Sequence, residues 1–261
     1  MRIALGLAYE GTSYYGWQNQ GLLPTLQLQI ERALTQVADH RVNVICAGRT
    51  DKGVHALGQV VHFDSSTTRE SRAWVCGSNS YLPSDIRVLW AQCVPEDFHA
   101  RFTASARSYR YILLNYPVAS PLMYRRVAWY PRPLDEQKMQ RAIYYLLGEH
   151  DFSAFRAAQC QAKSPIRTIT HVSVARIACW IVIDITANAF LHRMVRNIVG
   201  MLISIGAGEH EACWANTLLI TRDRNRLIAA PASGLYLYNV LYPQYFNIIQ
   251  SPDMMPFLQP A

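Results

Sequence analysis

The stretch RIALGLAY, residues 2–9, decides the fold class of this chain. Its large side chains, Ile3, Leu5, Leu7 and Tyr9, alternate with smaller ones, so one face of the segment is more apolar than the other. A period of two residues is typical of a β-strand and not of a helix. We therefore predict a half-buried strand over residues 2–9.

The sequence after this strand continues with helix and strand patterns. Apolar residues at helical spacing follow Thr25, a residue type that commonly caps a helix N-terminus. The elements predicted for this half are a helix over 26–37, strands over 42–47 and 59–63, a helix over 72–79 and a strand over 86–94. Their order, β-α-β-β-α-β, indicates an α+β fold.

The second half of the chain has a similar order of patterns. The elements predicted here are a strand over 107–115, a helix over 134–147, paired strands over 168–177 and 180–186, helices over 189–205 and 211–220, and a strand over 235–242. The similar order of the halves predicts two ferredoxin-like or RRM-like sub-domains. We place the first, with the loop described below, at 1–104, the second at 105–246, and a loose tail at 247–261.

The basic residues of the chain are almost all arginines. Of the 261 residues, 25 are basic and 18 acidic, which gives a net charge of +7, and 22 of the basic residues are arginine. Arginine binds phosphate through paired N–H groups and stacks on bases. With 15 Tyr and 6 Trp, this composition favours a nucleic-acid partner. A genomic preference for arginine codons is the alternative explanation.

The cysteines and the apolar segments bear on the compartment. The six cysteines form no CxxC pair, and most lie in apolar runs, so we predict buried thiols in a reducing compartment and neither a disulfide framework nor a metal site. The first residues do not have the pattern of a signal peptide. The longest apolar stretch is shorter than the roughly 18 residues that a membrane span needs. The sequence therefore predicts a cytoplasmic protein that does not cross a membrane.

A polar loop bounded by glycines lies between two of the predicted strands, over residues 48–56. Loops held by strands often carry catalytic groups. Arg49 lies two residues before Asp51, and a nearby guanidinium keeps a carboxylate ionised, as a nucleophile requires. The alternative is an aspartate that only closes the turn through its side chain, with Arg49 as a surface partner.

Seven segments together resemble one family, the tRNA pseudouridine synthase I family. In chain order they are YEGTSYYGWQ at 9–18, GRTDKGVHA at 48–56, FHARF at 98–102, ARSYRY at 106–111, DFSAF at 151–155, NAFLHRMVRN at 188–197 and GLYL at 234–237. They occur in the order of the family's motifs and span about residues 2–242. Lys52 is a departure, since the family commonly has a small residue after the aspartate.

The resemblance implies a fold and a reaction. The fold would have two α+β sub-domains that form a continuous antiparallel sheet, with helices on one side and a basic central cleft. The protein would be a homodimer and an isomerase that needs neither a cofactor nor a metal. Its substrate would be tRNA, in which it converts uridines 38, 39 and 40 of the anticodon arm to pseudouridine.

The resemblance also assigns roles to single residues. Asp51 would be the catalytic aspartate, and Tyr109 would stack on the target uracil. Arg49 and Arg196 would hold Asp51 and enter the space that the flipped base leaves. Leu235 would form a wall of the uracil pocket.

The chemistry of the reaction agrees with these roles. Pseudouridine formation breaks the bond from N1 to C1′ and joins C5 to C1′ without a redox change, so one carboxylate suffices. The target base has to leave the stack, and an aromatic face recovers part of that cost. The helical spacing predicted for 189–205 puts His192 and Arg196 on one face. A solvated helix face is the alternative reading of Arg196, and His192 is either a packed side chain or a phosphate contact.

Two other classes of protein are alternatives. A non-catalytic RNA-binding protein with RRM-like halves would stack bases on sheet aromatics, but the segment 107–112 is a distant match to that pattern. It would not need the paired charges around Asp51. A glycosidase usually needs two carboxylates, and the candidates for a second one, Asp85, Glu96 and Asp184, lie in no motif.

Overall fold

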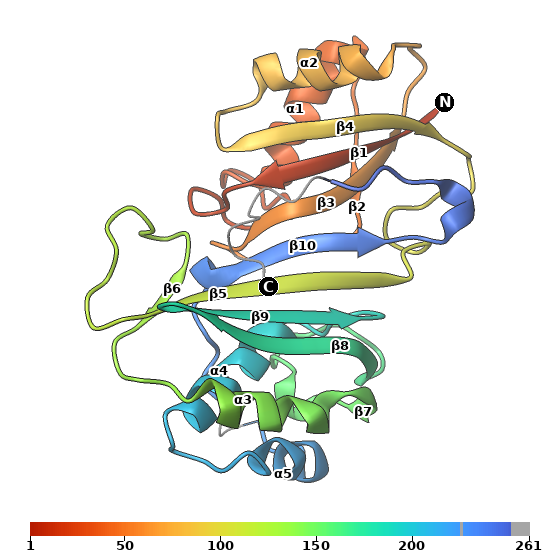
Figure 1. Ribbon diagram of the computed structural model, residues 1–261. Coiled ribbons are helices and arrows are strands. Elements are labelled where there is room, and N and C mark those ends of the chain that lie inside the picture. The colour runs from red at the N-terminus through yellow and green to blue at the C-terminus, as the bar shows by residue number, and fades with distance from the viewer. Residues whose placement is uncertain (225–226, 252–261) are drawn as a thin grey trace. The chain divides into compact units, whose positions relative to one another are not determined.

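The computed structural model describes residues 1–224 and 227–251 (Figure 1). The strands are β1 (Arg2–Tyr9), β2 (Ile45–Cys46), β3 (His55–Asp64), β4 (Ile86–Val94), β5 (Ala106–Asn115), β6 (Ala128–Tyr130), β7 (Gly148–Asp151), β8 (Ile166–Ile177), β9 (Trp180–Ala187) and β10 (Leu235–Leu241). The α-helices are α1 (Leu26–Ala38), α2 (Ser71–Tyr81), α3 (Glu136–Ile143), α4 (Met194–Gly206) and α5 (Trp214–Thr221). The predicted α+β class is therefore confirmed.

The chain forms two compact units. The described part of the first comprises residues 1–107 and 236–251, and that of the second lies within 108–235. Strand β10 belongs to the first unit by its pairing with β3. The division into sub-domains at 1–104 and 105–246 stays a prediction, and most of the expected tail, 247–261, lies outside the described residues.

Strand β1 is a central strand of the first unit, in the order β4-β1-β3-β10. It pairs antiparallel with β3 and with β4. The prediction of a half-buried strand was wrong, because Ala4 is as fully buried as Leu5. The indole of Trp90 lies over Gly6, where it leaves no room for a Cβ atom. The small residues of β1 are thus needed for packing on its second face.

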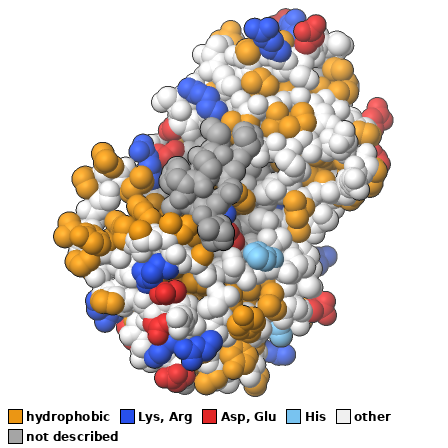
Figure 2. Space-filling model, in the orientation of Figure 1, with side chains coloured by type: hydrophobic (Ala, Val, Ile, Leu, Met, Phe, Trp, Pro, Cys, Tyr) orange, Lys and Arg blue, Asp and Glu red, His pale blue; other side chains and the backbone are white. Residues whose placement is uncertain are grey.

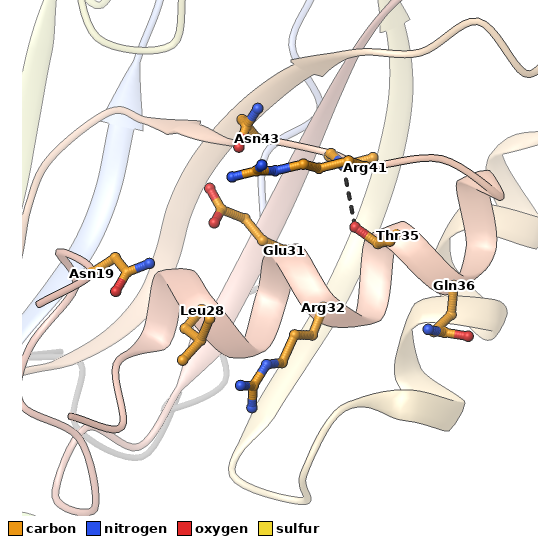
Figure 3. A pocket seen from close by; sticks show the side chains of 9 residues that line it. Asn19, Leu28, Glu31, Arg32, Thr35, Gln36, Arg41 and Asn43 are labelled. Atoms are coloured by element: carbon orange, nitrogen blue, oxygen red, sulfur yellow. Dashed lines mark hydrogen bonds between the residues drawn. The ribbon is translucent and has the colours of Figure 1, made fainter. Parts of the chain in front are cut away.

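The segment 42–44, the first part of the strand predicted over 42–47, is bound to helix α1 instead. The N–H of Val42 donates to Thr35 Oγ1 at 3.2 Å, as Figure 3 shows, and the N–H of Val44 donates to Glu31 Oε1 at 3.0 Å. These helix side chains occupy the backbone groups that a strand would use. Only β2 remains of the strand predicted over 42–47.

The second unit has the strand order β5-β9-β8-β7, with β6 beside β5. Strands β8 and β9 form the predicted hairpin, in which Ile177 pairs with Trp180. Its two-residue turn contains Ala178 at a φ of 53°, although this position lacks the glycine or asparagine that such turns favour. Helix α3 packs on β8 and on α4. Of the helix predicted over 134–147, the α-helix covers only Glu136–Ile143, and a 3-10 turn over Tyr144–Leu146 follows it. The Asp135 carboxylate caps its start by accepting from the N–H groups of Gln137 and Lys138.

The helix predicted over 189–205 begins only at Met194, so His192 does not share a helix face with Arg196. Arg193 has a φ of 62°, which ends any helical path through it. The residues before it bond elsewhere: the N–H of Ala189 donates to Asn188 Oδ1, and the N–H of Ala157 donates to the carbonyl of His192. These hydrogen bonds compete with the helix that the apolar pattern favours.

The strands are not all antiparallel, which corrects the expected sheet. Strand β10 runs parallel to β3, and β6 runs parallel to β5. Alternation of side chains predicts a strand but carries no information on the direction of its partner. The continuous sheet and the basic central cleft that the resemblance implies stay predictions.

The cysteines correct a further expectation. All six are free, as predicted, but Cys46 alone is buried, and Cys76, Cys93 and Cys213 are exposed. Apolar neighbours in the sequence therefore did not indicate burial of the thiols. Within residues 1–224 and 227–251, the structure contains no helix with the length and apolar character that a membrane span requires.

Candidate functional site

The loop that carries Asp51 is tied to the sheet of the first unit at two residues that precede it. The hydroxyl of Tyr9, on β1, lies 2.8 Å from Thr50 Oγ1 in a buried hydrogen bond. The side chain of Gln59, on β3, donates to the carbonyl of Gly48 at 2.6 Å and accepts from its N–H at 3.3 Å. Residues that precede Asp51 are therefore held by two neighbouring strands, which orients the loop in advance of binding.

A second segment, residues 11–17, packs directly against this loop. The N–H of Trp17 donates to the carbonyl of Thr50 at 2.9 Å. Gly16 has a φ of 83°, and a Cβ atom there would lie 2.7 Å from the same carbonyl oxygen. Gly11 approaches the carbonyl of Val54 too closely to carry a side chain. The family-like segments at 9–18 and 48–56 are thus two parts of one packed structure.

The charged residues of the loop differ in their exposure. Asp51 is half-buried, and its carbonyl accepts from the N–H of Val54 at 3.1 Å, which closes the turn. Arg49 and Lys52 are exposed. The ammonium of Lys52 lies 3.9 Å from the centroid of the Tyr15 ring, in a cation–π contact. The additional cation after Asp51 therefore has an aromatic partner of its own.

His55, near the end of the loop, has structural contacts. Its side chain is 1% exposed, and Nδ1 accepts from the N–H of Gly11 at 3.0 Å. Its ring stacks on Tyr236 with 4.7 Å between the centroids. An imidazole that accepts a hydrogen bond from Gly11 and stacks on Tyr236 fixes the end of the loop.

In the second unit, Tyr109 is half-buried on β5. Its ring meets Phe190 edge-on, with 5.0 Å between the centroids. Because side chains two residues apart share a face of a strand, Tyr109 lies on the same face as Tyr111. The hydroxyl of Tyr111 donates to the carbonyl of Pro231 at 2.9 Å, and burial raises the pKa of this hydroxyl well above its usual range.

Arg196 is fixed by the segment that contains Ala230. Its Nε donates to the carbonyl of Ala230 at 2.8 Å, and the N–H of Ala230 donates to the carbonyl of Arg196 at 2.9 Å. The guanidinium also acts on Tyr111, whose pKa it lowers against the larger effect of burial. The Arg196 guanidinium therefore lies near the Tyr111 hydroxyl, on the strand that carries Tyr109. Leu235, at the start of β10, is 6% exposed.

The alternative candidates have structural partners. Asp184 binds Arg110 through two hydrogen bonds of 2.8 and 2.9 Å, and Asp85 accepts from the hydroxyl of Tyr14 at 2.6 Å. The N–H of His192 donates to Cys160 Sγ at 3.4 Å. Across the described ranges, no group of three or more His, Cys, Asp or Glu residues is arranged to hold a metal ion.

A hollow beside helix α1 is distinct from this loop. It is lined by Asn19, by helix residues between Leu28 and Gln36, and by residues 41–43 (Figure 3). Glu31 at its wall accepts from Gln27 as well as from Val44. No residue expected at the site lines this hollow, so we assign it no function.

Sequence reasoning missed the residues that hold the site. Tyr9 was used as part of a strand pattern and of the segment 9–18, and Gln59 only as the start of another strand, and neither was expected to bond the 48–56 loop. Ala230 lies in no motif. The positive φ of Gly16 had one signal, its place within the glycine-containing turn at 11–18, but nothing in the sequence showed that it packs on Thr50.

Comparisons with known proteins identify the family. A family model described as tRNA pseudouridine synthase matches residues 7–103 and 142–243. A tRNA pseudouridine synthase A of Coxiella burnetii is 50% identical over 260 residues, which are 99% of this chain and 99% of that protein. Proteins of the same name from Vibrio cholerae and Vibrio parahaemolyticus are 51% and 53% identical, over 97% and 95% of this chain and 96% and 94% of their own.

The chain therefore belongs to the tRNA pseudouridine synthase family, and it is an isomerase that acts on tRNA. The reading as a non-catalytic RNA-binding protein is set aside. Arg49, Asp51, Arg196 and Leu235 lie within the matched segments, and Tyr109 lies between them. A solved structure described as a Cbf5-Nop10-Gar1 complex gives a TM-score of 0.34 at 10% identity, over 77% of this chain and 45% of that chain. This similarity is too weak for a conclusion about the fold.

Proposed function

We propose that this chain converts uridines 38, 39 and 40 of the tRNA anticodon arm to pseudouridine, with Asp51 as the catalytic carboxylate. The observation that carries the proposal is the double attachment of the 48–54 loop, through Tyr9 to Thr50 and through Gln59 to Gly48. A loop held in this way keeps its carboxylate in one position before the substrate arrives. Such positioning accounts for a large part of catalytic rate enhancement.

The reaction leaves the composition of the nucleotide unchanged. The bond between N1 and C1′ breaks, the base turns, and C5 bonds to C1′; C5 then loses its proton while N1 gains one. In the proposed mechanism, the Asp51 carboxylate either attacks the sugar or removes a proton from it. Neither route requires an oxidant, a group donor or an energy source, and we propose that the enzyme works without a cofactor or a metal ion.

The other site residues serve the flipped base in this proposal. The target uridine leaves the stack, at a cost of a few kcal/mol, and the Tyr109 ring stacks on it. Arg49 and Arg196 hold the Asp51 carboxylate and fill the place of the base, and Leu235 keeps water from the uracil. The fixed orientation of Arg196 through Ala230 and the edge contact of Tyr109 with Phe190 support these roles.

We further propose a homodimer that works in the cytoplasm. An exposed apolar surface on the second unit supports self-association (Figure 2). It lies in the loop between β5 and β6, where Tyr116, Val118, Leu122 and Tyr124 are between 54% and 79% exposed. Light scattering of the purified protein measures the oligomeric state directly.

The test of the proposed reaction is pseudouridine mapping of an unmodified tRNA transcript that has uridines in the anticodon arm. Wild type, Asp51→Asn and Asp97→Asn are compared with EDTA and without an added cofactor. The exposed Asp97 is the matched control. We expect wild type and Asp97→Asn to form pseudouridine at 38–40, and Asp51→Asn to lose at least about 10³-fold in turnover, because the catalytic carboxylate is removed.

Binding of the same tRNA separates catalysis from recognition. We expect Asp51→Asn to bind tRNA within a few-fold of wild type. Full turnover by Asp51→Asn would refute the catalytic role of Asp51. Pseudouridine outside the anticodon arm would refute the proposed positions.

A further inference from the structure

Phe102 is an exposed aromatic ring on a turn whose other side is buried. Its side chain is 75% exposed, whereas Phe98, four residues earlier, is fully buried. Phe98 contacts the rings of Tyr242 and Phe246, with centroid distances of 5.0 and 5.2 Å. The turn over residues 98–103 is therefore anchored in the core of the first unit while it presents Phe102 to solvent.

The imidazole of His99 orders this turn. Its Nδ1 accepts from the N–H groups of Arg101 and Phe102, at 3.2 and 3.1 Å. The carbonyl of His99 accepts from the hydroxyl of Thr103 at 2.7 Å. The imidazole ring stacks on the Phe102 ring, with 4.4 Å between the centroids and 24° between the planes. Phe102 thus rests on a ring that is itself held in place by two backbone donors.

Contacts with the rest of the first unit hold the turn rigidly. The N–H of Ala100 donates to His62 Nδ1 at 3.1 Å, and the Tyr242 hydroxyl donates to the carbonyl of Ala100 at 2.7 Å. Arg107 donates to the carbonyls of Ala104 and Arg101. A rigid aromatic surface loses little conformational entropy when a second ring stacks on it.

Arginines surround this turn and the start of the Asp51 loop. The guanidinium carbon of Arg101 lies 5.5 Å from the centroid of Phe102, and Arg107 donates to the carbonyl of Ala47 at 3.2 Å. Burial raises the pKa of Cys46 to about 12, and the charges of Arg49, Arg101 and Arg107 oppose this rise. Three guanidinium groups therefore lie around the residues that lead into the catalytic loop.

We propose that Phe102 is a stacking surface for a nucleotide of the bound tRNA, and that Arg101 contacts the adjoining phosphate. The proposal rests on tRNA as the substrate. An exposed ring beside several guanidinium groups suits a nucleic acid. A base can stack on the ring while the guanidinium groups neutralise the phosphates. A site that binds another protein would more often set such a ring within a larger apolar patch.

The test compares tRNA binding and turnover of Phe102→Ala, Phe102→Trp and Tyr81→Ala with wild type. Tyr81 is the matched control, because it is 59% exposed and lies in the same unit at the end of α2. We expect Phe102→Ala to raise Kd and KM about 10-fold with kcat within about two-fold, since stacking of one base is lost. Phe102→Trp keeps the wild-type affinity, and Tyr81→Ala leaves Kd and KM unchanged.

Salt dependence tests the role of Arg101 separately. The slope of log Kd against log salt concentration should fall by about one for Arg101→Gln, because one phosphate contact is removed. Thermal unfolding of each variant checks that the fold is kept.

Two results would overturn the proposal. One is a Kd of Phe102→Ala within two-fold of wild type. The other is a change in oligomeric state of that variant, measured by light scattering, without a change in tRNA affinity, which would assign Phe102 to an interface between copies. Because Kd does not depend on where pseudouridine forms, a failure of the proposed positions 38–40 would be distinguishable from a failure of this inference.

Discussion

Gly16→Ala is the substitution that tests most directly how the Asp51 loop is positioned. The new Cβ would lie 2.7 Å from the carbonyl oxygen of Thr50 and 3.1 Å from the carbonyl carbon of Asp51. Ordinary van der Waals contact begins at 3.4 Å, so the loop backbone has to move by about 0.7 Å. Both atoms belong to the backbone of the catalytic loop, and neither can rotate away as a side-chain end would.

Two costs follow, and they can be measured separately. An alanine at a φ of 83° costs roughly 1–2 kcal/mol in the free energy of unfolding. The displaced loop adds a loss of activity: a misplacement of about 1 Å in an active site can cost about 10²-fold. For a shift of about 0.7 Å we expect at least about a 10-fold decrease in kcat.

Gly21→Ala is the matched control, because Gly21 also has a positive φ, of 69°, but has no atom within 4 Å of the Cβ position. Chemical denaturation measures the stability of both variants, and pseudouridine formed per tRNA under saturating conditions measures kcat. We expect both to lose about 1 kcal/mol or more in stability, and only Gly16→Ala to lose turnover. Equal turnover of the two variants would refute the reasoning that Gly16 positions the loop.

Two further predictions concern stability. Burial lowers the pKa of His62 to about 4, so the folded state resists its protonation; stability conferred by the neutral ring should be present above pH 6.5 and fall by up to about 3 kcal/mol as the pH drops toward 4. Chemical denaturation at several pH values checks this, and a His62→Gln variant with an unchanged pH profile would contradict it. Asp184→Asn, which leaves the 5% exposed Arg110 guanidinium without its carboxylate, should cost about 3 kcal/mol, whereas Asp64→Asn, whose pair with Arg2 has a 66% exposed carboxylate, should cost less than about 1 kcal/mol. Similar unfolding midpoints for these two variants would show that burial of the pair is not the deciding factor.

The elements that the sequence predicted well are those with long, regular patterns. The strand over 86–94 has the predicted limits, and the helix over 26–37 differs by one residue. In both, the apolar period extends over several turns or pleats, so local chain geometry alone selects the element. Strands β6 and β7, of three and four residues, are too short to show a period and were not predicted.

The residues of the candidate site were found by motif, and their contacts were not. Asp51 and Arg49 stand in a segment that the sequence marks clearly. The bonds that hold them come from Tyr9 and Gln59, which are 41 and 11 residues away from their partners Thr50 and Gly48. Contacts between residues so far apart in the sequence cannot be deduced from local patterns, because they depend on which strands pair.

The sequence by itself determined the α+β class, the positions of most helices and strands, and the motif residues of the family. These follow from side-chain periodicity and from residue types, which are local properties of the chain. Tertiary structure alone decided that β10 runs parallel to β3 and that α4 begins only at Met194, after Arg193 in the left-handed conformation. It also decided that the His99 imidazole supports an exposed Phe102. Strand direction, positive φ values and buried hydrogen bonds depend on partners distant in the chain, and only the folded chain brings those partners together.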